Sequence, residues 1–247
     1  MKIYYGTSGY SYKSWRGIFY PDKIPPQEML RCYAARFPAV EINHTFYHLP
    51  TGGVLTSWSE QVPDDFVFAF KAPRIITHRK RLKNIGEETT YLFRTLSLLG
   101  SKLGPVLFQF PPNFPPDPVR LKGLFDLIPE KIPCAFEFRN PTGPTPEVLD
   151  ILRRKNASLC VADTEEAPAG TVTPTAAWGY LRLRRSAYTR EDLRRWLERI
   201  REQNWERAFV FFKHEEEGRG PQWAQLFQDL LPAEPLPPPQ AARSGRR

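Results

Sequence analysis

Short apolar runs rich in β-branched and aromatic residues recur along the chain, and each run is typical of a buried strand. They follow one another at intervals of roughly 30 residues, which is the length of one strand–helix unit. The eight runs are Ile3–Gly6, Ala39–Asn43, Phe66–Lys71, Pro105–Phe110, Cys134–Arg139, Ser158–Asp163, Trp178–Arg184 and Ala208–Lys213. The pattern therefore predicts eight strands in succession.

Amphipathic segments occupy most of the gaps between these runs and predict helices. They span Pro26–Phe37, Glu87–Leu99, Pro118–Ile128, Pro146–Lys155 and Thr189–Gln203, and a last helix begins at Pro221. Thr189, with Asp192 three positions later, is a variant of the capping box that begins a helix. The gap Thr164–Ala177 contains proline and glycine without a helical period, so we expect a loop or a short helix in place of the sixth helix.

Strands that alternate with helices imply a parallel sheet, and eight such units favour a closed barrel over an open sheet. An open dinucleotide-binding sheet usually carries a GxGxxG motif after its first strand, and this sequence has none there. We predict an α/β protein with a single (β/α)₈ TIM barrel over residues 1–231. Residues 232–247 are rich in proline, alanine and arginine, and we expect them to form a disordered tail.

Side chains of a strand point alternately to its two faces, so the strand pattern also predicts which residues share a face. In most runs one face is wholly apolar and must meet the outer helices, which leaves the mixed face to point into the barrel. Polar groups on that face lie mainly near the carboxyl ends of the strands, where barrel enzymes build their sites. We assign these charged residues to the interior: Glu41, Lys71, Glu137, Arg139, Asp163, Arg182, Arg184 and Lys213.

The formal net charge is +8, which indicates an anionic partner such as nucleic acid, phosphate or an acidic metabolite. A solvated basic surface without any partner explains the same excess. Cys32, Cys134 and Cys160 form no CxxC pair, which is typical of buried thiols in a reducing compartment. No apolar run approaches the roughly 20 residues that span a bilayer, and the N-terminus lacks the features of a secretory signal. We expect a cytoplasmic protein without a membrane partner; its oligomeric state stays open.

Six ordered sequence blocks resemble a known family. They are Gly6-Thr7-Ser8-Gly9-Tyr10, Val40-Glu41-Ile42-Asn43, Phe70-Lys71 with Thr77-His78 and Arg81-Leu82, Gln109-Phe110-Pro111-Pro112, Glu137-Phe138-Arg139 and Tyr180-Leu181-Arg182-Leu183. Over nearly the whole chain, to about Leu231, the sequence resembles the YecE-like family, a domain of unknown function. The resemblance implies a (β/α)₈ barrel and brings no established activity. Many members have His-Gly after the last block, whereas this chain has Arg184-Arg185, which adds positive charge.

An anion pocket is the chemistry that the inward bases favour, because guanidinium groups present paired donors that fit carboxylate or phosphate. Its candidate anion-holding residues are Lys71, His78, Arg81, Arg139, Arg182 and Lys213. Thr7 and Ser8 lie in a glycine-flanked turn that offers backbone donors to an anion. Residues expected to shape the pocket are Tyr12, Trp15, Asn43, Gln109 and Tyr188.

Acid–base catalysis is the second candidate chemistry, with Glu41, Glu137 and Asp163 as the proton carriers. The same carboxylates could hold a divalent metal. A multi-metal hydrolytic site normally needs more histidine than the four in this chain, so we predict no cofactor. The chain has no GxSxG motif, which disfavours Ser8 or Thr7 as a nucleophile.

We hypothesise a protein that binds a phosphate-bearing or other anionic ligand at the carboxyl face of the barrel. Whether it also acts on that ligand, as a hydrolase or another acid–base enzyme, stays open. One alternative is a noncatalytic nucleic-acid-binding protein that uses the same basic rim, with Tyr12, Trp15 and Tyr188 stacking on bases. Another is a closed ion-pair network that fills the barrel and has only a structural role.

Overall fold

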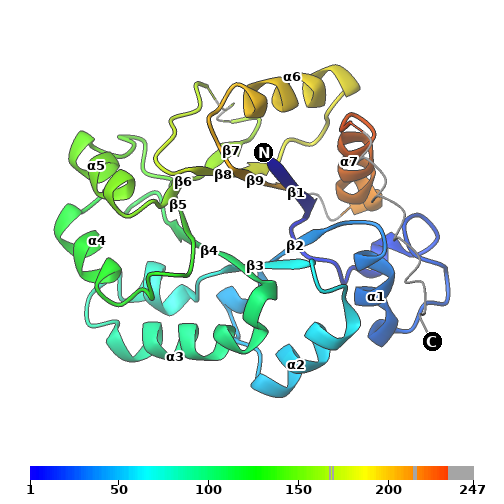
Figure 1. The fold of residues 1–247 in the computed structure, drawn as a ribbon, viewed down its shortest axis with the longest axis horizontal. Helices are drawn as coiled ribbons and strands as arrows, with labels where there is room; N and C mark the ends of the chain where they lie inside the picture. The colour runs from blue at the N-terminus through cyan, green and yellow to red at the C-terminus, as the bar shows by residue number, and fades with distance from the viewer. Residues whose placement is uncertain (167, 169, 214–215, 233–247) are drawn as a thin grey trace, which may run out of the picture.

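A ring of parallel strands lies inside a ring of helices in the computed structural model, which describes residues 1–166, 168, 170–213 and 216–232 (Figure 1). The strands, all paired in parallel, are β1 (Lys2–Thr7), β2 (Ala39–Ile42), β3 (Val67–Lys71), β4 (Leu103–Phe110), β5 (Cys134–Phe138), β6 (Ser158–Leu159), β7 (Val161–Asp163), β8 (Trp178–Leu183) and β9 (Arg207–Phe212). The predicted tail beyond residue 232 lies outside the described residues.

Helices cover the outside of this ring. They are α1 (Met29–Ala34), α2 (Gly52–Gln61), α3 (Gly86–Leu96), α4 (Pro118–Phe125), α5 (Pro146–Arg154), α6 (Arg190–Arg201) and α7 (Arg219–Gln228). The capping box predicted for Thr189 and Asp192 is present at the start of α6. The described residues between β7 and β8 contain no helix, which confirms the expected loop. None of the described helices combines the length and the apolar character that crossing a membrane requires.

The nine strands form two hydrogen-bonded sheets, β1-β9-β8-β7 and β2-β3-β4-β5-β6, that meet at two seams. At one seam the predicted strand Ser158–Asp163 is divided at Cys160, so that β6 pairs with β5 and β7 pairs with β8. The Cys160 backbone N–H still donates to the Phe136 carbonyl at 2.8 Å, which carries the ladder through the division. The eight predicted strand positions are therefore all occupied.

At the other seam β1 meets β2. Ser8 and Glu41 form a parallel bridge, and the Gly9 backbone N–H donates to the Glu41 carbonyl at 2.8 Å. A side chain on Gly6 would place its Cβ 1.9 Å from the Ala39 carbonyl oxygen, so only glycine allows β1 to approach β2 this closely. Together the two seams close the ring, and the single (β/α)₈ barrel is confirmed.

Each face of the strands packs into its own hydrophobic core, one outside the barrel and one inside it. The outer core contains Val40, Phe68 and Phe136 and packs beneath the helices. The inner core fills the barrel and consists of Ala39, Val67, Ala69, Leu107, Ala135, Trp178, Tyr180, Phe209 and Phe211. Its members on β2, β3 and β5 are small, whereas those on β8 and β9 are aromatic, so large rings fill the space left by small side chains. The predicted alternation is confirmed for these strands.

Gly6→Ala tests the close approach at the seam between β1 and β2. The new Cβ would overlap the Ala39 carbonyl, and a backbone atom cannot move aside as a flexible side chain can. We expect the free energy of unfolding to fall by roughly 3 kcal/mol or more. Gly53→Ala is the matched control, because a Cβ there meets nothing within 4 Å in α2. Urea unfolding of both variants measures the effect, and equal stabilities would refute the packing argument.

Candidate functional site

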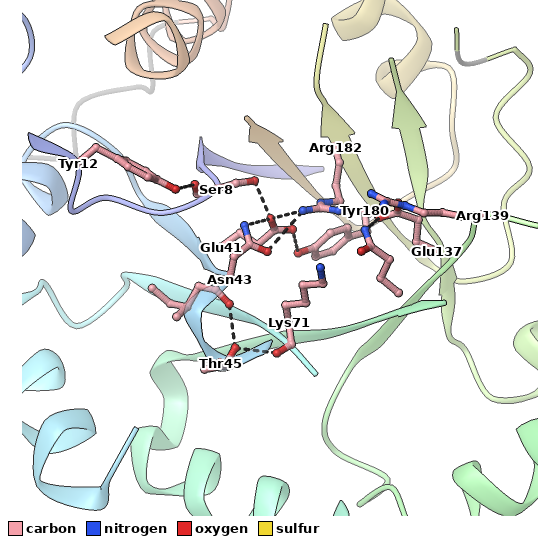
Figure 2. A network of polar contacts seen from close by, with 12 residues as sticks. Ser8, Tyr12, Glu41, Asn43, Thr45, Lys71, Glu137, Arg139, Tyr180 and Arg182 are labelled. Carbon is pink, nitrogen blue, oxygen red and sulfur yellow. Dashed lines mark hydrogen bonds and ion pairs between the residues drawn. The ribbon is translucent and has the colours of Figure 1, made fainter. Parts of the chain in front are cut away.

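Polar side chains converge at the carboxyl ends of the strands, on the face that points into the barrel (Figure 2). The strands deliver them at their last two residues or just beyond, where the inner core ends. They are Ser8 after β1, Glu41 and Asn43 on and after β2, Lys71 on β3, Gln109 on β4, Glu137 and Arg139 on and after β5, Arg182 and Arg184 on and after β8, and Lys213 after β9. The predicted gathering of inward charges at this end is present.

The Arg182 guanidinium lies between two carboxylates at the centre of this group. Its Nη2 donates to Glu41 Oε1 at 3.0 Å, and its Nη1 donates to Glu137 Oε2 at 2.7 Å. Arg182, Glu41 and Glu137 are 2%, 0% and 3% exposed, so the three charges are withdrawn from water together. Because burial of an unpaired charge is very costly, each of these groups depends on the others.

Neighbouring side chains complete the hydrogen bonding of Glu41. The Ser8 hydroxyl donates to its Oε1 at 2.6 Å, and the Asn43 amide donates to the same oxygen at 3.0 Å. The Tyr180 hydroxyl donates to Oε2 at 2.7 Å. Both oxygens of Glu41 therefore have partners, and β1, β2 and β8 all contribute to holding this carboxylate.

Glu137 is held in a similar way from its own side of the barrel. The Gln109 amide donates to Oε2 at 2.8 Å, and Arg139 Nε donates to Oε1 at 2.8 Å. Arg139 is more solvent-accessible than Glu137: its side chain is 36% exposed, and that of Glu137 is 4% exposed. Gln109 and Arg139 thus join the predicted site by fixing the orientation of Glu137.

Both glutamates remain ionised in this environment. Burial raises the pKa of Glu41, but Arg182 and the Ser8 and Tyr180 hydroxyls act against burial and hold that pKa below its usual value. Burial also raises the pKa of Glu137, and Arg182 and Arg139 more than compensate, so its pKa is lowered as well. These carboxylates are weak bases with no proton to donate near neutral pH. This environment suits Glu41 and Glu137 to holding Arg182 in place better than to transferring protons. The catalytic role of the two glutamates stays a prediction.

A cavity of about 650 Å³ opens beside this network. Its charged lining comes from five bases, Lys71, Arg139, Arg182, Arg184 and Lys213, and the described residues that line it include no carboxylate. Aromatic rings form much of the remaining wall: Tyr10, Tyr12, Phe46, Tyr47 and Trp58. The mouth of the barrel therefore combines positive charge with apolar surface.

Lys71 is the inward base at the end of β3. Burial lowers its pKa to about 7, and the positive charge of Arg182 contributes in the same direction. Its Nζ lies 3.9 Å from the centroid of the Phe46 ring. A substantial fraction of this amine is neutral at physiological pH, which makes it unlike an ordinary surface lysine.

Arg184 also lines the cavity. The sequence predicted that it faces inward, but not that it is a ligand-binding residue. It is only partly exposed, and its Nε has no hydrogen-bond partner. Burial lowers its pKa from the usual value, followed by the charge of Arg182. Residue alternation predicts the inward face of Arg184, but it does not predict the burial or the unsatisfied donor.

Asp163 lies outside this site, and its assignment to the barrel interior is wrong. It pairs in register with Leu183, a member of the outer core, and its carboxylate binds Arg185 Nε and the Tyr188 hydroxyl at 2.9 Å each. Cys160 packs on the inner core, so alternation along the segment turns Asp163 to the opposite face. Tyr188 packs against Trp223 and likewise does not line the cavity.

Three other predicted site residues, Thr7, Trp15 and Arg81, do not line the cavity. Thr7 pairs with Phe212 on the outer face, and its hydroxyl contacts the Tyr33 hydroxyl at 3.0 Å. Trp15 is 1% exposed and packs on Tyr12, which does line the cavity. The Arg81 carbonyl accepts from Arg120 at 3.4 Å, and Arg81 does not line the cavity. These residues support the loops around the mouth.

His78 lies next to the cavity wall. Its ring meets the Phe46 ring edge-on at a centroid distance of 4.9 Å, and its Nδ1 is 2.8 Å from the Thr77 hydroxyl. Burial lowers its pKa to about 4, with Lys71 and Arg74 adding to the effect, so the imidazole is neutral at pH 7. A neutral His78 supports Phe46 and contributes no cationic charge to an anion site.

The described residues contain no group of three or more histidine, cysteine, aspartate and glutamate side chains placed to hold a metal. Glu41 and Glu137 both bind Arg182, which would have to move before either could coordinate a cation.

Comparison with known sequences places this chain in a family. The sequence model of the family described as "Protein of unknown function DUF72" matches residues 4–244. The chain belongs to the DUF72 family. This DUF72 protein is also 31% identical over 140 residues to the UPF0759 protein YecE of Escherichia coli, a match that covers 56% of this chain and 49% of YecE. The chain thus spans about half the length of that relative, and the predicted YecE-like resemblance is confirmed.

Solved structures similar to this DUF72 protein support the barrel. A DUF72 family protein from Thermotoga maritima superposes with a TM-score of 0.80 at 26% identity, covering 93% of this chain and 99% of that one. A xylose isomerase-like TIM barrel fused to a 4-hydroxyphenylpyruvate dioxygenase superposes with a TM-score of 0.51 at 12% identity, covering 86% of this chain and 39% of that one. The second likeness concerns the fold alone.

Arg182→Met tests whether the two glutamates depend on this guanidinium. Without it, Glu41 and Glu137 would be buried as unbalanced anions, and we expect a loss of roughly 3–5 kcal/mol of stability at pH 7. In the variant burial raises the pKa values of the two glutamates above their unfolded values. The deficit should therefore shrink as the pH falls and these groups take up protons.

Unfolding free energies of the wild type and Arg182→Met between pH 5 and 8 check this expectation. Arg153→Met is the control, because Arg153 forms an exposed ion pair within α5. A deficit for Arg182→Met that is the same at every pH would contradict the account.

Proposed function

We propose that this DUF72 protein binds a small anionic ligand, carrying a phosphate or carboxylate group, in the cavity at the carboxyl ends of the strands. The observation that carries the proposal is the cavity lining, in which five bases face the space and none of the described lining residues is acidic. Such a concentration of positive charge beside a low-dielectric wall attracts and holds anions.

Internal pairing consumes only part of this charge. Glu41 and Glu137 together balance Arg182 and Arg139, with which they form ion pairs of 2.7–3.0 Å. Among the cavity bases, Arg184 keeps an Nε without a partner, and an unsatisfied buried donor costs about 1–3 kcal/mol. An oxyanion at this position would accept that hydrogen bond, and guanidinium geometry suits phosphate and carboxylate equally.

The cavity also limits the size and character of the ligand. At about 650 Å³ it lies within the usual range of small-molecule sites, which is roughly 300–1,000 Å³. The rings of Tyr12, Phe46 and Trp58 offer apolar surface to an organic part of the ligand. The proposal is therefore a phosphorylated or carboxylated metabolite in preference to a free inorganic ion.

Noncatalytic binding of nucleic acid is the alternative use of the same surface. One observation favours it: Tyr47 lines the basic cavity and is 67% exposed, so its ring is accessible for stacking on a base. The two functions differ in their response to salt, because a nucleic acid releases many counterions on binding, whereas a small ligand with one anionic group releases few.

Ligand-induced stabilisation tests the proposal. We expect inorganic phosphate and phosphorylated sugars at millimolar concentration to raise the Tm of the wild type, because a ligand that binds only the folded state shifts unfolding. Arg184→Met should lose the shift. Arg194→Met should keep it, because Arg194 is an exposed residue of α6 that pairs with Glu191.

The same experiment separates the alternatives. No shift with any phosphate or carboxylate compound would overturn the proposal. Tight binding of an oligonucleotide that weakens steeply with salt, without any effect of the small anions, would favour the nucleic-acid alternative. An equal shift in wild type and Arg184→Met would show that the anion binds elsewhere.

A further inference from the structure

Lys71 occupies a distinctive place in the cavity. It is the last residue of β3, on the inner face, and Figure 2 shows its amine end directed toward the Tyr180 and Arg182 side chains. Its backbone is held by β3 and by the Thr45 hydroxyl, which donates a hydrogen bond to the Lys71 carbonyl at 2.6 Å. The Phe46 ring lies 3.9 Å from Nζ and restricts the movement of the side chain.

Its surroundings do not provide a counterion. Among the described residues no carboxylate oxygen lies within 4.0 Å of Lys71 Nζ. Each oxygen of Glu41 and Glu137 already accepts from another side chain. Burial and the charge of Arg182 therefore prevail, and the pKa of Lys71 is lowered to about 7. An amine that is partly buried, open to a cavity and about half neutral near pH 7 is a nucleophile.

We propose that Lys71 is a catalytic amine that condenses with the carbonyl carbon of an anionic aldehyde or ketone held in this cavity. The substrate class is a carbonyl compound with a phosphate or carboxylate group. The inference rests on the proposed anion site, because Arg139, Arg184 and Lys213 line the same cavity and would hold the anionic group.

The condensation needs no oxidant or reductant. The lone pair of Nζ forms a bond to the carbonyl carbon, and the electrons of the carbonyl π bond move to oxygen, which takes up a proton. The nitrogen of this carbinolamine loses a proton to solvent, and its protonated hydroxyl leaves as water. The sum is amine, carbonyl compound and one proton giving an iminium ion and water. Glu41 and Glu137, whose charges act to raise the pKa of Lys71, favour the resulting cation.

Pyridoxal 5′-phosphate is a suitable probe because it joins an aldehyde, a phosphate and an aromatic ring in one molecule. The protein is incubated with it, reduced with borohydride and digested, and the modified peptides are found by mass spectrometry. We expect the adduct on Lys71, formed at pH 7 on the order of a hundredfold faster than on the exposed Lys122. Labelling of Lys71 should rise through pH 7 and then level off, because its amine loses its proton in that range.

Two variants control the experiment. Lys71→Arg should lose the adduct while its Tm without any ligand stays close to that of the wild type, which shows that the variant is folded. Lys122→Arg should label as the wild type does. Labelling confined to exposed lysines, or labelling of Lys71 that does not level off above pH 7, would overturn the inference.

The anion site and the amine can fail separately. If phosphate raises the Tm but borohydride traps nothing on Lys71, the nucleophile is refuted and the anion site stands. If Lys71 is trapped equally fast by uncharged propionaldehyde, and inorganic phosphate does not slow labelling by pyridoxal 5′-phosphate, the amine is reactive and the anion site is refuted.

Discussion

The ion pairs that hold one guanidinium between two carboxylates organise the mouth of this barrel. Arg182 belongs to β8, Glu41 to β2 and Glu137 to β5, so the pair of contacts joins the four-stranded sheet to the five-stranded sheet across the interior. The seams that close the ring on its circumference are short, consisting of the Ser8–Glu41 bridge and the division at Cys160. Glu41 takes part in one seam and in the central network, which couples closure of the fold to the geometry of the site.

The same network determines the electrostatics of the cavity. Three buried charges are tolerated because they satisfy one another, and the glutamates are then no longer available to the other bases. Lys71, more deeply placed than Arg139, consequently loses affinity for its proton, and Arg184 keeps an unpaired nitrogen. The residual positive charge is the physical basis for the proposed anionic ligand.

The sequence predicted much of this arrangement because alternation within a strand is a strict geometric rule. It placed Glu41, Glu137, Arg139 and Arg182 on the inner face, where they lie. The same rule predicts that Asp163 points outward, since it shares its face with the apolar Leu159 and Val161, which pack on the outer core.

Alternation along a strand does not predict loops, or contacts between residues that are far apart in the sequence. The helix α2 begins with two glycines and buries only Leu55, so it has almost no hydrophobic period to detect. Trp15 is buried although it lies between β1 and α1. The hydrogen bond from Tyr180 to Glu41 joins residues 139 positions apart. Neither contact can be derived from local spacing.

A crystal structure of the protein grown with inorganic phosphate tests the central claim most directly. The account predicts Arg182 between Glu41 and Glu137, and a phosphate ion in the cavity within hydrogen-bond distance of Arg184. An Arg182 side chain turned away from both glutamates would contradict the claim. So would phosphate bound only on the outer surface while the cavity holds none.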